Sequence, residues 1–320
     1  VAPGARSATS GSLVSMPSAL PAQIRVIVRD WLNANQIVLL DREAIVIDSG
    51  YGRDAQRTLE LLRAPGGLGG RSLDLVANTH CHSDHMGGNA VLSRAWDCPI
   101  AVPAGEAPLI ARWDAAALWL DFADQRCERF SAERSVAPGE VCQWGGLEWQ
   151  VLPAPGHDMH ALMFWCPQER ILISGDALWE SGFGVLLPGE GCEQRLRATR
   201  STLDAISGLD ARTVIPGHGK PFTEVGAALE RAYRRLDALA ADETRMARSV
   251  LKTMFVFSLL DRGAMRLADL PAYLARVPLY GEYNARYFAL AWESLARRLI
   301  EELALIGAVG REGDFIVACS

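Results

Sequence analysis

The sequence predicts an α/β protein: a four-layer αββα sandwich followed by a small C-terminal helical, winged-helix-like domain. Two observations predict the sandwich. Short apolar strands and amphipathic helices follow one another in two successive sets before Phe222, and several strands end in a histidine or aspartate beside a glycine. A third observation, a shift after Phe222 to helical patterns that end in a hairpin, predicts the second domain.

The first set of elements begins with strands whose apolar residues alternate, and it continues with helices that Pro and Gly terminate. The predicted elements are strands at residues 24–28, 36–40 and 44–47, a helix at 53–63, a strand at 73–78, a helix at 89–96 and a strand at 99–102. This order is typical of helices that pack on one face of a sheet.

The second set repeats the pattern. Its predicted elements are strands at residues 148–152, 162–165 and 170–173, a helix at 193–206 and a strand at 213–215. Between the two sets, residues 106–130 carry four aromatic side chains with aspartates among them. This segment is either a helical excursion over the mouth of a site or a pair of ordinary core helices, and the sequence leaves both interpretations open.

Helical patterns dominate the chain after Phe222. Helices are predicted at residues 225–248, 267–274 and 284–303, with a strongly apolar stretch at 251–260 and a hairpin formed by 306–309 and 315–318. Acidic and basic residues alternate on the last helix, so a DNA-binding face is disfavoured. We expect a structural or substrate-lining role. Tyr280, Tyr283 and Tyr287 share one helical face, which forms either a pocket rim or a core contact.

A cluster of histidines follows the strand at residues 73–78. His80, His82, Asp84 and His85 lie within six positions, in a chain that has six histidines in total. In extended backbone His80 and His82 point the same way, and the turn that follows can aim Asp84 and His85 at a second point. Imidazole and carboxylate at this density favour a metal site over a histidine-rich surface loop.

Three further polar residues, His157, Asp176 and His218, each follow an apolar strand and lie beside a glycine. Glycine lets the backbone turn sharply and approach an ion closely. With the cluster at residues 80–85 they supply five histidines and two aspartates, which is enough for two metal ions.

This set resembles the metallo-β-lactamase superfamily in its HxHxDH…H…D…H form, from about Asn35 to about Pro221. The resemblance implies a first metal on His80, His82 and His157, a second on Asp84, His85 and His218, and Asp176 as the bridge between them. It also implies that Asp48, in an Asp-Ser-Gly turn, supports the site. His160, the remaining histidine, is expected to line the pocket or form a hydrogen bond, and Cys81 is expected to be buried packing.

The resemblance implies a dinuclear hydrolase of a small ester, thioester or lactone, with Asp84 and Asp176 as catalytic residues and a metal-bridging hydroxide as the nucleophile. Two divalent ions are expected, Zn²⁺ before Fe or Mn. Residues 177–184 differ from the Cys-Gly-Arg-rich segment of glyoxalase II, which argues against glutathione thioesters. Two alternatives are kept: an endoribonuclease or phosphodiesterase, and a mononuclear iron persulfide dioxygenase.

The composition of the chain limits the classes of partner that we expect. The net charge of −6 gives no global field that attracts nucleic acid, and no apolar run is long enough to span a bilayer. Seven cysteines without a CxxC pair are typical of reduced thiols, so we expect a cytoplasmic protein. The expected partner is a small-molecule substrate, and a homodimer is left open. We predict a disordered extension at 1–15, a catalytic domain at 16–224 and the winged-helix-like domain at 225–320.

Overall fold

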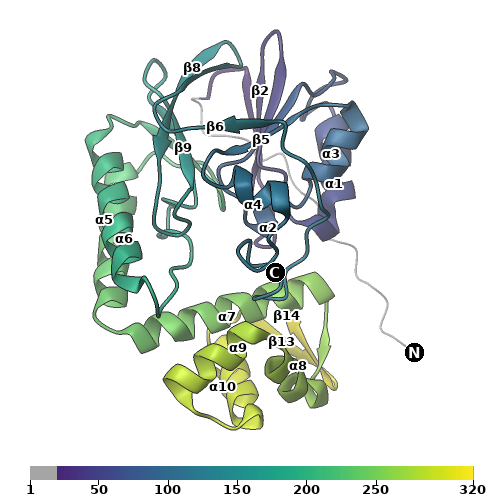
Figure 1. Ribbon diagram of the computed structural model, residues 1–320, viewed down its shortest axis with the longest axis vertical. Coiled ribbons are helices and arrows are strands. Elements are labelled where there is room, and N and C mark those ends of the chain that lie inside the picture. Colours follow the sequence, from purple (N-terminus) through teal and green to yellow (C-terminus); the bar gives the residue numbers. More distant parts are fainter. Residues whose placement is uncertain (1–19, 320) are drawn as a thin grey trace.

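The computed structural model describes residues 20–319, and Figure 1 shows their arrangement. Two sheets lie face to face, with helices on both outer sides and a smaller module at one end. The predicted extension at residues 1–15 lies outside the described residues.

The first sheet has six strands in the order β1-β2-β3-β4-β5-β6. The strands are β1 (Ile24–Ile27), β2 (Gln36–Leu40), β3 (Ala44–Ile47), β4 (Leu75–Ala77), β5 (Ile100–Pro103) and β6 (Arg134–Val136). β1, β2 and β3 pair antiparallel, and β3 to β6 pair parallel. Helices α1 (Ala55–Arg63) and α3 (Asn89–Trp96) cover its outer face with an apolar cluster.

The second sheet has five strands in the order β11-β10-β9-β8-β7. They are β7 (Val141–Trp144), β8 (Leu147–Pro153), β9 (Leu162–Cys166), β10 (Ile171–Gly175) and β11 (Thr213–Pro216). Helices α5 (Cys192–Gly208) and α6 (Val225–Ala240) cover its outer face. Between the sheets lies a core in which Trp149 and Phe164 pack against Ile37 and Ile47. The predicted αββα sandwich is confirmed, although β6 and β7 were not predicted.

The single helix predicted at residues 225–248 is wrong, because the chain forms two helices there. α6 ends at Ala240, and α7 (Glu243–Arg262) begins after Asp242, whose carboxylate accepts the Arg245 backbone N–H at 2.9 Å. α6 packs on the second sheet. The domain boundary at residue 224 stays a prediction, and we propose Ala240 as an alternative because α6 packs with the sandwich. Within residues 20–319, no helix combines the length and apolar character that crossing a bilayer requires.

The C-terminal module contains more elements than predicted. They are α7, β12 (Met265–Arg266), η2 (Leu267–Asp269), α8 (Leu270–Arg276), α9 (Pro278–Tyr283), the π-helical turn η3 (Asn284–Phe288), α10 (Trp292–Leu305), β13 (Val309–Glu312) and β14 (Phe315–Ala318). The strands form a sheet in the order β12-β14-β13. Pro271 lies at the start of α8, where a missing N–H costs nothing, rather than breaking a helix. The helix predicted at 284–303 is interrupted, and α10 begins at Trp292.

The tyrosine face of the module is core. Tyr280 and Tyr283 are 1% and 2% exposed and belong to the cluster that joins α7, α8 and α10. The Tyr287 hydroxyl donates to Glu243 at 2.8 Å. None of the three lines the pocket beside the histidine cluster, so the core interpretation is confirmed.

Replacing Tyr280 by alanine is expected to lower the free energy of unfolding by about 3–5 kcal/mol, as for other large buried aromatic residues. Tyr280→Phe is the control, because the Tyr280 hydroxyl has no hydrogen-bond partner among residues 20–319 and its loss should cost less than about 1 kcal/mol. Urea denaturation measures both. Equal stability of the two variants would contradict the core assignment.

Candidate metal centre

The histidine cluster at residues 80–85 lies where the chain leaves β4. His80 is fully buried, and His82 precedes the one-turn helix α2 (Ser83–Met86), which carries Asp84 and His85. Ser49 holds this turn in place, because its backbone N–H and its hydroxyl both donate to the carbonyl of His85, at 2.7 and 3.1 Å. The cluster is therefore presented by buried, hydrogen-bonded backbone rather than by a free loop.

The ends of β8, β10 and β11 bring the remaining predicted residues to the same place. Three groups have donor atoms that lie within 4.8 Å of one another: His80, His82 and His157; His80, His85 and Asp176; and Asp84, His85 and His218. His82 Nδ1 is 2.9 Å from His157 Nε2, and His218 Nε2 is 3.0 Å from Asp84 Oδ2. All seven predicted side chains thus converge on one region.

Asp176 lies between the two outer groups, and its two oxygens face different ways. Oδ2 is 3.4 Å from His157 Nε2, while Oδ1 is 3.4 Å from His85 Nε2 and 3.9 Å from His218 Nε2. The Trp179 indole N–H donates to Oδ1 at 3.1 Å and fixes the orientation of the carboxylate.

The donor set fits metal ions. Within residues 20–319, His80 Nε2 and His85 Nε2 are buried without a hydrogen-bond partner, which is costly unless another group binds them. A ring nitrogen of two candidate ligands is already engaged on the side away from the cluster: His157 Nδ1 lies 2.5 Å from the Val185 carbonyl, and His85 Nδ1 lies 2.8 Å from Asp48 Oδ2. Such outward hydrogen bonds are typical of metal-binding histidines, whose other nitrogen is left free.

Asp48 lies beneath the histidine cluster and contacts both Thr79 and His85. Its carboxylate accepts the Thr79 backbone N–H at 2.9 Å and the Thr79 hydroxyl at 2.8 Å, in addition to contacting His85. Asp48 adopts a φ of 60°, a strained conformation for a residue with a side chain. The structure therefore brings Asp48 to the position from which it can support the ligands.

The electrostatics favour the forms of these groups that bind metals. Burial lowers the pKa of His82 and of His157 to about 4, so both rings are neutral near pH 7. Burial alone would raise the pKa of Asp176, but His85 and His218 outweigh it and hold that pKa well below its usual range. Metal ligands must be deprotonated, as His82, His157 and Asp176 are. His85 is the exception: burial would lower its pKa, but Asp48, Asp176 and Asp84 raise it well above its ordinary value, so a metal that binds there would displace a proton.

Gly217 allows the backbone before His218 to approach the site. A Cβ at this position would lie 2.4 Å from Asp176 Oδ1 and 2.9 Å from His85 Cε1. Gly217→Ala should therefore displace Asp176 and lower kcat/KM on the order of a hundredfold, with less metal bound per chain. The matched control is Gly226→Ala in α6, where an added Cβ meets nothing within 4 Å. Metal analysis and kinetics of both variants check this, and equal metal content would contradict it.

Asn35 ties the turn that carries His218 to the start of β2. Its side-chain amide donates to the carbonyls of Pro216 and Gly219, at 2.9 and 2.7 Å, and its backbone N–H donates to the carbonyl of Gly217 at 2.7 Å. This support was not predicted, because a lone asparagine before a strand carries no signal in the sequence.

A narrow pocket opens over the site, with mainly apolar walls. It is lined by Trp31, His82, Ser83, Asp84, Leu118, Trp119, Gln125, His157, Asp176, Trp179, Val185, His218, Thr253, Met254 and Phe257. The rings of Trp31 and Trp179 pack edge to face with centroids 5.3 Å apart, and their centroids lie 5.1 and 5.2 Å from that of the His218 ring. Trp31 and the residues of α7 were not predicted to lie here.

The segment at residues 106–130 supports both interpretations in part. Its only helix is the short α4 (Ala107–Arg112), and turns follow. Trp119 lines the pocket, whereas Trp113 and Phe130 pack against each other in the core at 5.6 Å. The prediction for Cys81 is confirmed, since it is fully buried. His160 is exposed and does not line the pocket, so that part of its prediction is wrong.

Comparisons with known proteins agree with this architecture. The hydroxyacylglutathione hydrolase of Idiomarina loihiensis is 29% identical over 147 residues, 46% of this chain and 46% of that protein. The acyl-coenzyme A thioesterase MBLAC2 of Gallus gallus is 29% identical over 209 residues, 59% of this chain and 72% of that protein. The chain spans about half the length of hydroxyacylglutathione hydrolases such as the first.

A solved structure extends the likeness over the C-terminal module. The metallo-beta-lactamase family protein TTHA1429 from Thermus thermophilus has a TM-score of 0.57 and 22% identity, covering 94% of this chain and 100% of that chain. Its likeness concerns the fold. The sequence model of the family described as "Metallo-beta-lactamase superfamily" matches residues 29–218, which is more than half of the sequence. The chain therefore belongs to the metallo-beta-lactamase superfamily.

Proposed function

We propose that the protein is a dinuclear metal-dependent hydrolase of small thioesters. The observation that carries the proposal is the overlap of the three donor groups: the middle group shares His80 with the first and His85 with the third, and adds Asp176. Two adjacent ions, with Asp176 between them, satisfy this pattern. The proposed ligands are His80, His82 and His157 for one ion, Asp84, His85 and His218 for the other, and Asp176 for both.

Such a pair, when bound, supplies an activated water and polarises a carbonyl oxygen. The residues of the chain supply position and environment. Trp179 holds Asp176 through its indole N–H, and Asp48 orients His85. Trp31, Trp119 and Phe257 line the pocket with apolar surface, which suits an acyl group and excludes bulk water.

The relatives support a thioester as the substrate class. Hydroxyacylglutathione hydrolase and acyl-coenzyme A thioesterase both name thioesters, on glutathione in one protein and on coenzyme A in the other. In the proposed reaction, water adds to the carbonyl carbon, the C–S bond breaks, and a carboxylic acid and a thiol leave. The native metal is proposed to be Zn²⁺, because imidazole and carboxylate ligands suit it.

Metal analysis after anaerobic purification, followed by a panel of thioesters, esters, lactones and phosphodiesters, tests the proposal. We expect two metals per chain and the highest kcat/KM on a thioester. One iron per chain with oxygen consumption on a persulfide, or cleavage of phosphodiesters alone, would overturn it.

A further inference from the structure

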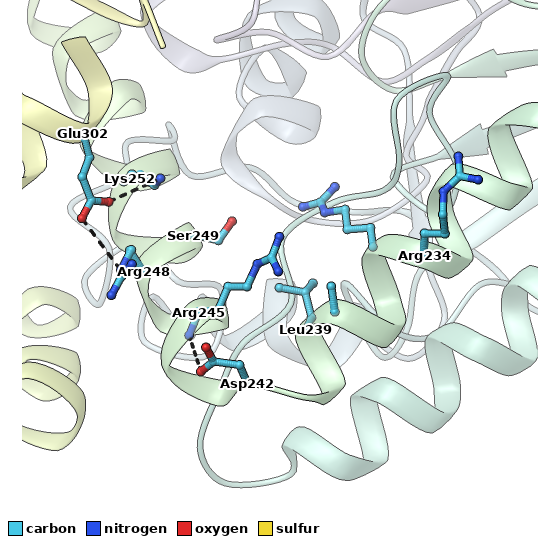
Figure 2. A pocket seen from close by; sticks show the side chains of 10 residues that line it. Arg234, Leu239, Asp242, Arg245, Arg248, Ser249, Lys252 and Glu302 are labelled. Carbon is cyan, nitrogen blue, oxygen red and sulfur yellow. Dashed lines mark hydrogen bonds and ion pairs between the residues drawn. The ribbon is translucent and has the colours of Figure 1, made fainter. Parts of the chain in front are cut away.

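A second cavity lies where α6, α7 and α10 meet, outside the metal centre. This basic cleft has a volume of about 670 Å³ and is lined by Arg234, Arg235, Ala238, Leu239, Asp242, Arg245, Arg248, Ser249, Lys252 and Glu302. Figure 2 shows its side chains on α6 and α7, on either side of the turn that joins them, and Glu302 on α10. None of its residues is used in the proposed chemistry at the metal centre.

The basic cleft is strongly positive in a chain whose net charge is −6. Five of its side chains are cationic, and two are carboxylates. Glu302 is shared among several cations: it lies 2.9 Å from Arg298, 3.5 Å from Lys252 and 3.9 Å from Arg248. One carboxylate therefore cannot neutralise the cations that surround it.

Two arginines of α7, Arg245 and Arg248, line the cleft without a hydrogen-bonded guanidinium partner in the described part of the chain. The Arg245 side chain is exposed and extends toward the open middle of the cleft, while only its backbone N–H is held by Asp242. Arg248 Nε is buried and lies 3.9 Å from Glu302, but it has no hydrogen-bond partner among residues 20–319. A buried guanidinium nitrogen without a hydrogen bond, next to an open cleft, indicates an anionic ligand.

The basic cleft connects to the metal centre along α7. The pocket over the metal centre shares Trp31 and Thr253 with a groove between the sandwich and the C-terminal module. That groove shares Ser249 and Lys252 with the basic cleft. At 1.5 Å per residue, Thr253 and Arg245 lie about 12 Å apart along the helix. A single extended molecule can therefore occupy both ends.

We propose that the basic cleft binds the phosphates of a thiol carrier that ends in a phosphorylated nucleotide, as coenzyme A does. This inference rests on the proposed function, because the thioester of the same molecule would lie at the metal centre. Arginine suits phosphate because its guanidinium donates two parallel hydrogen bonds.

The length of the carrier favours coenzyme A over glutathione. The pantetheine arm has about thirteen bonds between sulfur and the first phosphorus and spans about 16 Å when extended. That reach exceeds the distance of about 12 Å along α7 between Thr253, at the metal-centre pocket, and Arg245, in the basic cleft. The two arms of glutathione extend only about 7 and about 10 Å from the sulfur, and they end in carboxylates rather than phosphates. Hydrolysis breaks the C–S bond and releases the carrier with a protonated thiol, while water supplies the oxygen of the acid.

The kinetic test compares a short-chain acyl-coenzyme A with the same acyl group on pantetheine, which lacks the nucleotide. The double variant Arg245→Ala, Arg248→Ala removes two cations from the cleft. The control, Arg197→Ala with Arg297→Ala, removes two exposed cations that do not line it. We expect the parent to prefer acyl-coenzyme A about 30-fold in kcat/KM, and only the cleft variant to lose that preference. Equal kcat/KM on both substrates in the parent would overturn the inference.

Calorimetry with adenosine 3′,5′-bisphosphate separates this inference from the proposed function. We expect binding by the parent that weakens with salt, survives chelation of metal and is lost in the cleft variant. Binding with no hydrolysis of any thioester would overturn the proposed function and leave the nucleotide site standing. Absence of bisphosphate binding, or arginine-dependent binding of an RNA oligomer in its place, would overturn the inference.

Discussion

His80→Ala is expected to lower kcat/KM by on the order of a thousandfold or more and to reduce bound metal. His80 is a proposed ligand of the first ion and also belongs to the middle donor group with His85 and Asp176, so its loss should empty the first position. Removing a residue that only supports a ligand costs about 10–100-fold in metal affinity, and removing a ligand should cost more. Metal quantitation and steady-state kinetics on the best thioester measure the effect.

His160→Ala is the matched control for this substitution. It also removes one imidazole, but from an exposed position that lies in none of the donor groups. We expect parental metal content and rate. A fully active His80→Ala variant that retains two metals would show that His80 is not a metal ligand.

Asp176→Asn is expected to lower kcat about a hundredfold and to lower the occupancy of one metal more than that of the other. The amide has the size of the carboxylate and can still accept the Trp179 N–H, but it has no negative charge to share between two ions. Near-ultraviolet circular dichroism reports whether the aromatic packing survives.

The control for charge alone is Asp204→Asn. Asp204 lies in α5 and accepts the Tyr233 hydroxyl at 2.6 Å, away from the metal centre. It should leave metal content and kcat unchanged. If Asp176→Asn matches this control in both measurements, Asp176 only supports other residues and does not bridge.

The local sequence was sufficient to predict the sandwich and the residues that converge in it. Short, mainly apolar runs located β2, β3, β9 and β10 closely, because these strands are buried along nearly their whole length. β6 was missed because it is three residues long and begins with two exposed ones. Histidines and aspartates at strand ends were informative since all these ends meet at one edge.

The residues that line the metal-centre pocket and the basic cleft could not be predicted from local sequence in the same way. Trp31 lies in an irregular loop, and its position depends on contacts with Trp179 and Phe257 that are distant in sequence. The break between α6 and α7 was hidden by continuous helical periodicity, although Asp242 is a typical N-cap. Arg234 and Arg245 face one cleft only because the chain turns there, and a net acidic composition concealed that concentration of charge.

Asn35 also constrains the order in which the chain folds. Its bonds to Pro216 and Gly219 join residues that are 181 and 184 positions apart. Closing so long a loop is entropically costly and slow, so these bonds form only after both sheets have docked. Until then the turn that carries His218 has no fixed position, although the turn at residues 80–85 is already local to β4. Complete metal uptake should therefore accompany the last folding step, and the rate of uptake during refolding would report on that step.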